Sequence, residues 1–247
     1  MTDIVEIKSG LPECKPIQEA MDVYIKGVHP NLPRRAGAVY LMVGAGGSGK
    51  SSTLYNFFKK GTGKSYMRGH FDNIYLFTPE SSFLSVKNHP FEEHENVFHT
   101  LDSETLEEIH EELLEFKNES LANKRPIEDS LIIIDDFAPL LKQDKQLMKA
   151  LNTFISKCRH VRCSFIFTLQ AFKYCPPLLR RQITYMSIWK PRNAVEWGQI
   201  SGEVFNIPKH KQQSIYEYCF NEPYNHLDYD VIENKLYKNF NEIKIED

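Results

Sequence analysis

The chain has 247 residues, of which 41% are hydrophobic, and carries 33 acidic and 30 basic side chains for a formal charge of −3. This length and apolar content suit one large α/β domain or two small ones with an ample core. The nearly balanced charge argues against a surface devoted to nucleic acid, and no apolar run approaches the ~20 residues that a membrane span needs.

Along the chain, a polar and proline-punctuated segment gives way to an alternation of apolar runs and helical periodicity. We interpret residues 1–36 as an N-terminal arm with a short helix near 16–26. Residues 37–194 are expected to form the core, and residues 195–247 a helical extension packed on it. The predicted strands are 38–43, 73–78, 130–134, 164–168 and 183–189, and the predicted helices are 50–60, 103–119 and 144–158.

Strands that alternate with helices require crossover connections. We therefore predict an α/β fold with a mainly parallel central sheet and helices on both faces. Helix 103–119 carries many glutamates opposite its apolar stripe, and we interpret that acidic side as a solvated outer face.

A glycine-rich loop follows the first predicted strand. Residues 44–51 read Gly-Ala-Gly-Gly-Ser-Gly-Lys-Ser, the G-x-x-x-x-G-K-[ST] pattern of P-loop NTPases. Glycines let backbone N–H groups turn toward phosphate oxygens, and the helix that follows presents its positive dipole end to them. The residues predicted to bind the nucleotide are Gly44, Ala45, Gly46, Gly47, Ser48, Gly49, Lys50, Ser51 and Ser52.

Within this loop, Lys50 is predicted to reach the β- and γ-phosphates and Ser51 to join the ligands of a Mg²⁺ ion. Two further acids, Asp135 and Asp136, directly follow the apolar strand 130–134. Ligands of open α/β sheets bind at the carboxyl ends of the strands, so this placement is informative. We expect Asp135 beside the Mg²⁺, through a coordinated water, and Asp136 in position to orient the attacking water.

Gln170 follows the predicted strand 164–168. If this strand lies between the other two, Gln170 emerges near the γ-phosphate, where its amide can donate to phosphate and accept from water. Arginines are a further requirement, since a guanidinium stabilises the charge on a phosphoryl group in transfer. The candidates are Arg159, Arg180 and Arg181, and the sequence does not decide whether any acts in cis or in trans.

The five cysteines are odd in number and none are spaced as Cys-x-x-Cys. This pattern favours reduced thiols in a cytosol-like compartment over a zinc site or a disulfide framework. The first residues also lack the basic and apolar stretches of a secretory signal. We expect an intracellular location.

Taken together, these features resemble the packaging ATPases of the FtsK/HerA superfamily, in particular the poxvirus-type virion-packaging ATPases of large DNA viruses and virophages. The similarity covers most of residues 29–230. The matching stretches are His29-Pro30, residues 44–52, the strand with its two acids at 132–136, Arg159-His160, Gln170, residues 177–182 and, more weakly, residues 224–230.

The resemblance implies a RecA-like sheet with an additional strand between the two nucleotide-site strands. It also implies a homo-oligomeric ring around double-stranded DNA. Carried over residue by residue, it makes Lys50 and Ser51 phosphate and Mg²⁺ contacts, Asp135 the metal-associated acid, Asp136 the catalytic base and Gln170 the sensor. The arginine finger maps to Arg159 or Arg180.

Two departures from the family pattern concern these assignments. Many members have Asp-Glu where this chain has Asp135-Asp136, and the shorter side chain reaches about one methylene less. In addition, Gln182 stands where an Asn is common after the arginine. The base assignment of Asp136 is therefore the weakest of the set.

We predict an ATP-hydrolysing, Mg²⁺-dependent motor that moves double-stranded DNA into a viral capsid. Its expected partners are the DNA, further copies of the chain and a capsid or vertex protein. Its expected location is a viral factory in the host cytoplasm or the virion. The densest basic cluster, and so the best candidate for DNA contact, is formed by Lys59, Lys60, Lys64 and Arg68.

Two other functions stay open at this point: a kinase and a nucleotide-binding clamp. A P-loop nucleoside or nucleotide kinase needs an arginine-rich lid, for which Arg180-Arg181 is a poor substitute. A GTPase is disfavoured because no Asn-Lys-x-Asp occurs in the chain. A structural clamp that binds a nucleotide without turnover is not distinguished from a motor by residues alone.

Overall fold

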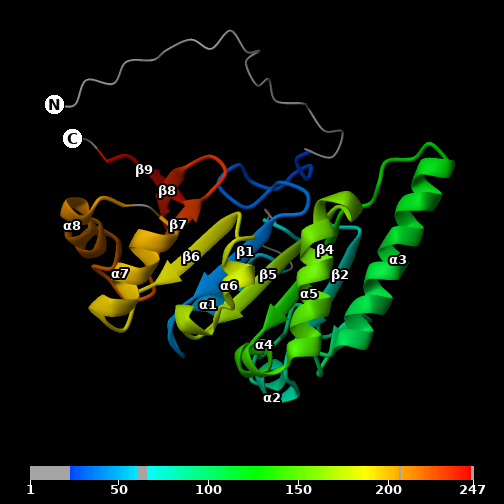
Figure 1. The fold of residues 1–247 in the computed structure, drawn as a ribbon, viewed down its shortest axis with the longest axis horizontal. Coiled ribbons are helices and arrows are strands. Elements are labelled where there is room, and N and C mark those ends of the chain that lie inside the picture. The colour runs from blue at the N-terminus through cyan, green and yellow to red at the C-terminus, as the bar shows by residue number, and fades with distance from the viewer. Residues whose placement is uncertain (1–22, 60–65, 206, 246–247) are drawn as a thin grey trace, which may run out of the picture.

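Strands from both halves of the chain form one nine-stranded sheet in the computed structural model, which describes residues 23–59, 66–205 and 207–245 (Figure 1). Its order is β3-β2-β4-β5-β1-β6-β7-β8-β9. The strands are β1 Val39–Val43, β2 Asn73–Phe77, β3 Val97–Phe98, β4 Ser130–Asp135, β5 Cys163–Leu169, β6 Tyr185–Trp189, β7 His226–Asp230, β8 Lys235–Lys238 and β9 Asn241–Ile243.

The helices lie between the strands and after them in the chain. The α-helices are α1 Lys50–Asn56, α2 Glu80–Leu84, α3 Ser103–Ala122, α4 Ala138–Gln143, α5 Lys145–Lys157, α6 Pro177–Arg180, α7 Ala194–Glu203 and α8 Lys209–Cys219, and the 3-10 helices are η1 Cys158–Val161 and η2 Phe172–Tyr174. In the described part of the chain, none of these helices combines the length and the apolar character needed to cross a bilayer.

Six neighbouring strands, from β3 to β6 in the sheet order, run parallel, as the alternation of strands and helices predicts. β5 lies between β4 and β1, which confirms the additional strand that the family resemblance implies. Ile166 of β5 is paired with Ile133 of β4 on one side and with Tyr40 of β1 on the other. Because parallel strands share one carboxyl edge, the residues that follow β1, β4 and β5 come together there.

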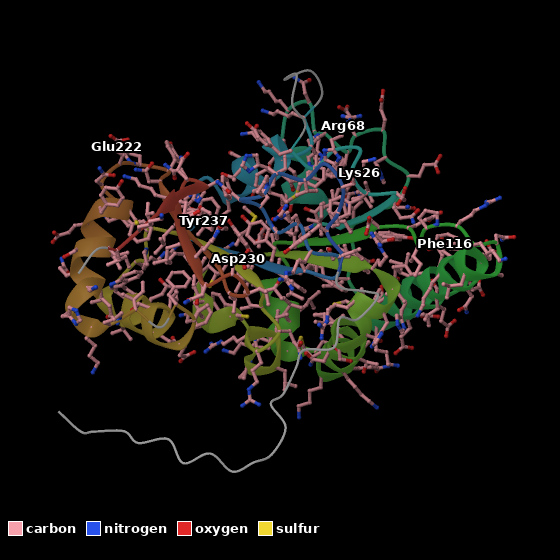
Figure 2. All side chains as sticks on the ribbon, turned by 90° about the horizontal axis from the view of Figure 1, so that it is seen from above. Lys26, Arg68, Phe116, Glu222, Asp230 and Tyr237 are labelled. Carbon is pink, nitrogen blue, oxygen red and sulfur yellow. The ribbon has the colours of Figure 1, made fainter. Side chains whose placement is uncertain are left out.

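The central strands are buried on both faces, which explains their continuous apolar sequences. Along β1, Val39, Leu41 and Val43 pack into one core cluster, whereas Tyr40 and Met42 pack into the other. The first cluster takes in residues of α3, α5, α7 and α8, and the second takes in residues of α1. Helices therefore cover both faces of the sheet, as predicted. Phe116 of α3 and Glu222 beyond α8 lie at opposite ends of the molecule (Figure 2).

The helical extension expected over 195–247 is helical only in its first half. α7 and α8 are helical, but β7, β8 and β9 continue the sheet antiparallel from the edge of β6. Leu227 and Tyr229 alternate with polar neighbours, and this period of two is the strand signal that the prediction overlooked. An unpaired β6 edge would leave a row of backbone groups without partners, and β7 satisfies them.

Smaller differences concern the ends of elements. α1 stops at Asn56, not at residue 60, and Phe57 and Phe58 then turn into the core. Most of the helix expected near 16–26 lies outside the described residues, and within 23–37 the backbone is non-helical, with Tyr24 bridged to Arg35. β6 begins two residues later than expected, and the short elements β3, α2 and α4 were not predicted.

Candidate nucleotide site

A cavity of about 750 Å³ opens at the carboxyl edge of the sheet, beside the glycine-rich loop. It is large enough for a nucleotide, because ligand pockets typically measure 300–1,000 Å³. Its walls come from the loop and α1, from α2, from the ends of β4 and β5, and from the segment before β7. The lining residues are Gly46, Gly47, Ser48, Gly49, Lys50, Ser51, Ser52, Thr53, Tyr55, Asn56, Ser82, Ser85, Val86, Asp135, Asp136, Thr168, Leu169, Gln170 and Tyr224.

The loop reaches α1 through two glycines in the left-handed region, Gly47 at φ 75° and Gly49 at φ 106°. Gly49 is the N-cap of α1 and offers no side-chain cap, so the first N–H groups of the helix stay available. These groups and the dipole of the helix make this end of the cavity attractive to an anion. Gly44 leaves no room for a side chain, because a Cβ there would lie 2.8 Å from Cβ of Trp189.

Lys50 is buried at 8% exposure and turns back onto the loop. Its Nζ donates to the carbonyl oxygens of Gly44, at 2.5 Å, and of Ala45, at 3.0 Å. Burial lowers the pKa of Lys50, while the carboxylates of Asp135 and Asp136 oppose this shift. Gly44 and Ala45 therefore contact Lys50 and do not line the cavity, unlike the other predicted loop residues.

Asp135 ends β4 with its side chain in the interior, at 3% exposure. Two hydroxyl groups donate to it: Tyr55 Oη to Oδ2 at 2.6 Å, and Thr168 Oγ1 to Oδ1. Burial raises the pKa of Asp135, and these two hydrogen bonds oppose the rise. The carboxylate is thus fixed in orientation by α1 on one side and by β5 on the other.

Asp136 lies one residue beyond β4 in the left-handed region, at φ 63°. Its Oδ1 accepts from Gln170 Nε2 at 3.0 Å, and its Oδ2 accepts from Ser82 Oγ at 3.2 Å. A non-glycine residue in this region is uncommon and is often found at functional sites. The turn sends the Asp136 side chain along the cavity, where Gln170 and α2 hold it.

The predicted arginines do not lie at this cavity. Arg159 is in η1, four residues before β5, and its Cα lies 2.7 Å from where a Cβ on Gly37 would be, just before β1. This is the amino edge of the sheet, opposite the cavity. Within one chain, the candidate arginines therefore lie away from the cavity, because residues that precede a parallel strand enter from its amino end.

Arg180 is engaged inside its own chain. Its guanidinium donates to the backbone oxygens of Cys175 and Phe172 and pairs with Glu203 at 3.0 Å. It also lies 4.3 Å from the centroid of the Phe172 ring. These contacts fix the turn around α6. The side chain of Arg181, by contrast, is exposed and forms no hydrogen bond or ion pair with any described residue.

Several residues at the cavity were not singled out from the sequence. Tyr55 and Thr168 orient Asp135, Ser82 contacts Asp136, and Tyr224 lines the far wall. Arg192, three residues after β6, is close enough for its charge to lower the pKa of Lys50. Its position after a strand was a usable signal, whereas Tyr55 and Ser82 depend on how α1 and α2 pack.

The expected basic cluster is only partly described. Lys60 and Lys64 lie outside the described residues, whereas Lys59 and Arg68 line a separate hollow of about 530 Å³. That hollow also contains Glu92 and Glu93, so its charge is mixed. The hollow by itself does not mark a DNA-binding surface.

The cavity suits Mg²⁺ brought in with a nucleotide better than a metal held by protein alone. Among the described residues, no group of three or more His, Cys, Asp or Glu side chains could hold an ion. The cavity does place the Ser51 hydroxyl and the Asp135 carboxylate on its wall. Mg²⁺ commonly takes one or two such oxygen ligands and completes its shell with phosphates and water.

The contact between Tyr55 and Asp135 can be tested by removing one hydroxyl. Tyr55→Phe leaves a buried carboxylate short of one donor, so we expect the free energy of unfolding to fall by about 1–3 kcal/mol. Tyr75→Phe is the matched control, because Tyr75 donates to Glu112 at 2.8 Å on the exposed side of α3. Denaturant unfolding at neutral pH measures both, and an equal loss in the two variants would contradict the special role of the buried bond.

Comparison with known structures shows a shared fold at low sequence identity. The genome-packaging NTPase B204 of Sulfolobus turreted icosahedral virus 2 matches in its complex with sulfate, with a TM-score of 0.57, 16% identity and coverage of 85% of this chain and 98% of that one. Its AMPPCP complex matches with a TM-score of 0.54, 17% identity and coverage of 85% and 100%.

A third match is a two-ATPase portion of EssC from Geobacillus thermodenitrificans, with a TM-score of 0.54, 15% identity and coverage of 77% of this chain and 42% of that one. No curated protein sequence matches the chain. The family model described as Poxvirus A32 protein matches residues 35–203, which include β1 to β6 and the whole parallel part of the sheet. The chain therefore belongs to the Poxvirus A32 protein family.

Proposed function

We propose that this chain is an ATP-hydrolysing motor that moves double-stranded DNA into a viral capsid. The observation that carries the proposal is the convergence of a phosphate-binding loop, two acids and an amide on one cavity. Membership of the Poxvirus A32 protein family and the fold shared with a genome-packaging NTPase support the same function.

In the proposed reaction, the triphosphate lies along the loop, and Lys50 exchanges the carbonyl oxygens of Gly44 and Ala45 for the β- and γ-phosphates. Asp136 orients a water molecule and accepts its proton as the water attacks the γ-phosphorus and ADP departs. Gln170 already contacts Asp136, so it can report the state of the γ-phosphate to β5. Ser51 and Asp135 would hold Mg²⁺, which neutralises phosphate charge when bound.

We further propose that the working form is a ring of identical chains that closes on the DNA and meets a capsid or vertex protein where virions are assembled. Closing a site between two chains requires them to shift, and such a shift couples hydrolysis to movement. Contacts to DNA would be made to its phosphates, so they would be independent of sequence and sensitive to salt.

The proposal is tested by measuring ATP hydrolysis with and without double-stranded DNA. We expect DNA to raise the rate severalfold, and we expect this increase to shrink as salt rises through the range where phosphate contacts weaken. Lys50→Ala is the control and should show no hydrolysis in either condition. If DNA leaves the rate unchanged while a nucleoside monophosphate accelerates ATP consumption, the chain is a kinase and the packaging function is wrong.

A further inference from the structure

Tyr224 forms the wall of the nucleotide cavity opposite the catalytic acids. It precedes β7, whereas Asp136 and Gln170 follow β4 and β5. The sheet order β4-β5-β1-β6-β7 places the glycine-rich loop, which follows β1, between these two groups. With strands ~4.8 Å apart, β5 and β7 are separated by roughly 14 Å. A triphosphate whose γ-phosphate faces Gln170 therefore extends its nucleoside toward Tyr224.

The side chain of Tyr224 is placed as an open aromatic surface. It is 71% exposed although it lines the cavity, and its backbone is left-handed at φ 67°. Its ring edge, at Cδ1, lies 3.3 Å from where a Cβ on Gly49 would be, so the ring adjoins the turn that leads into α1. A bulky residue in this backbone region costs free energy, and such strain persists where the surroundings impose it.

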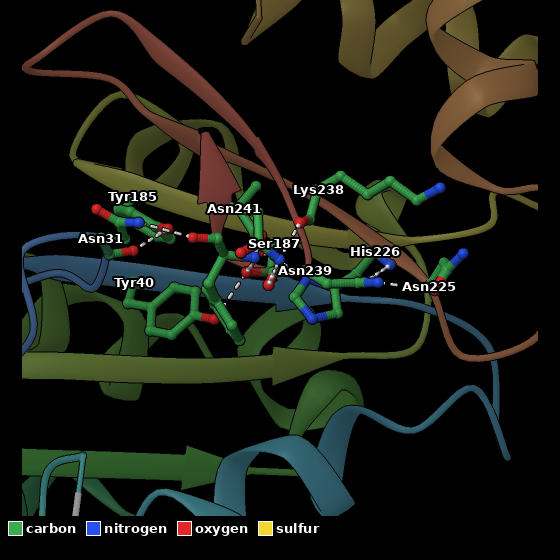
Figure 3. A network of polar contacts seen from close by, with 11 residues as sticks. Asn31, Tyr40, Tyr185, Ser187, Asn225, His226, Lys238, Asn239 and Asn241 are labelled. Atoms are coloured by element: carbon green, nitrogen blue, oxygen red, sulfur yellow. Dashed lines mark hydrogen bonds and ion pairs between the residues drawn. The ribbon is translucent and has the colours of Figure 1, made fainter. Parts of the chain in front are cut away.

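The surroundings of Tyr224 impose its position through the residues that follow it. Asn239 Nδ2 donates to Asn225 Oδ1 at 2.7 Å, and the backbone N–H of His226 donates to Asn239 Oδ1 at 2.9 Å (Figure 3). His226 is in turn held by Asp228 at 2.7 Å. The segment is therefore tied to β8 and to the interior of the sheet.

The same network reaches the glycine-rich loop from behind. The rings of His226 and Trp189 lie 4.9 Å apart, and Trp189 packs directly beneath Gly44 and Gly49. Asp228 also accepts from Ser187 Oγ, which contacts the hydroxyl of Tyr40 on β1 at 2.7 Å (Figure 3). The loop and the segment that carries Tyr224 thus pack on the same network of contacts.

We propose that Tyr224 is the stacking platform for the nucleobase. A flat and exposed ring, on a backbone that this network holds at the nucleoside end of a phosphate site, offers the contact that a purine face accepts. Stacking needs no particular pattern of donors and acceptors, because every base has a π-face. The platform therefore adds affinity for nucleotides in general, and ATP and GTP should gain from it alike.

The test compares nucleotide and inorganic tripolyphosphate binding by calorimetry. Tyr224→Ala and Tyr224→Asn should each weaken ATP and GTP about tenfold and leave tripolyphosphate unchanged, since only the base contact is lost. Asn tolerates a left-handed backbone, so the second variant removes the ring without strain. Tyr224→Phe should bind like the unaltered chain, and so should Tyr218→Ala, which removes another exposed tyrosine outside the cavity.

The platform rests on the nucleotide site of the proposed function, and the two fail in different ways. Unchanged ATP affinity in both Tyr224→Ala and Tyr224→Asn would overturn the platform alone. Equal weakening of ATP and tripolyphosphate would also overturn it, because the loop and not the base contact would then be affected. If the unaltered chain bound neither ligand, the nucleotide site itself would be overturned. These binding measurements contain no DNA, so their outcome does not depend on whether DNA stimulates hydrolysis.

Discussion

Replacing Asp136 by asparagine is expected to lower the rate of ATP hydrolysis by about 10²–10⁴-fold, the range for removal of a general base. Affinity for ATP should change little. The amide of asparagine keeps one oxygen to accept from Gln170 or Ser82, as Asp136 does now at 3.0 and 3.2 Å. It no longer accepts a proton from water, so binding and turnover should separate. Single-turnover hydrolysis and equilibrium ATP binding measure the two.

Two further variants sharpen this prediction. Asp136→Glu restores a carboxylate with one more methylene, the residue that many related ATPases carry, and we expect it to retain much of the activity. Lys50→Ala should lose both hydrolysis and affinity, because its ammonium group is the proposed phosphate contact of the loop. Hydrolysis by Asp136→Asn at the unaltered rate would mean that Asp136 is not the base. A clamp without turnover would instead show no hydrolysis in the unaltered chain.

The predictable part of this molecule is the part in which chain order dictates position. The apolar runs before Gly44 and before Asp135 identify β1 and β4, and parallel strands must end at one edge. That reasoning brought Lys50, Asp135, Asp136 and Gln170 to the same cavity from the sequence alone. The placement of β5 between β4 and β1 was implied by family resemblance and was not available from periodicity.

The unpredicted part depends on packing between distant segments. In the sequence, nothing distinguishes Tyr55 from the other aromatic residues in and after α1. It becomes a donor to Asp135 only because that helix packs against β4. Tyr224 follows a turn after α8, and its place at the cavity depends on β7 pairing with β6. The strand alternation of Leu227 and Tyr229 was visible in the sequence, but it is short, and short apolar patterns are ambiguous between strand and helix.

The structure changes which arginine can act on the transferred phosphoryl group. The guanidinium of Arg180 is bonded to Cys175, Phe172 and Glu203. Replacing Arg180 should therefore lower the stability of the fold before it affects hydrolysis. The side chains of Arg159 and Arg181 are exposed and make no hydrogen bond or ion pair to another described residue. Each precedes a strand by four residues, which places it toward the amino edge and away from the cavity of its own chain. If either of them acts on a phosphoryl group, we expect it to do so in the cavity of a neighbouring chain.

A head-to-tail ring that set the amino edge of one sheet against the carboxyl edge of the next would satisfy this requirement. In such a ring, Arg159→Ala or Arg181→Ala should lower hydrolysis by about 10³–10⁵-fold, the contribution of an arginine finger. Mixing the inactive variant with Lys50→Ala chains should then restore activity, since a Lys50→Ala chain still lends its arginine to an intact neighbouring loop.

With random mixing at equal amounts, about one interface in four pairs an intact loop with an intact arginine. The mixed sample should therefore hydrolyse ATP at roughly a quarter of the unaltered rate if the sites act independently, while each variant alone stays inactive. Arg180→Ala is the matched control and should show a lowered unfolding midpoint without complementation. Recovery with Arg159→Ala but not Arg181→Ala, or the reverse, identifies the residue. Absence of recovery with both, at any ratio, would mean that neither completes a site in trans, because complementation follows directly from a finger that one chain supplies to another.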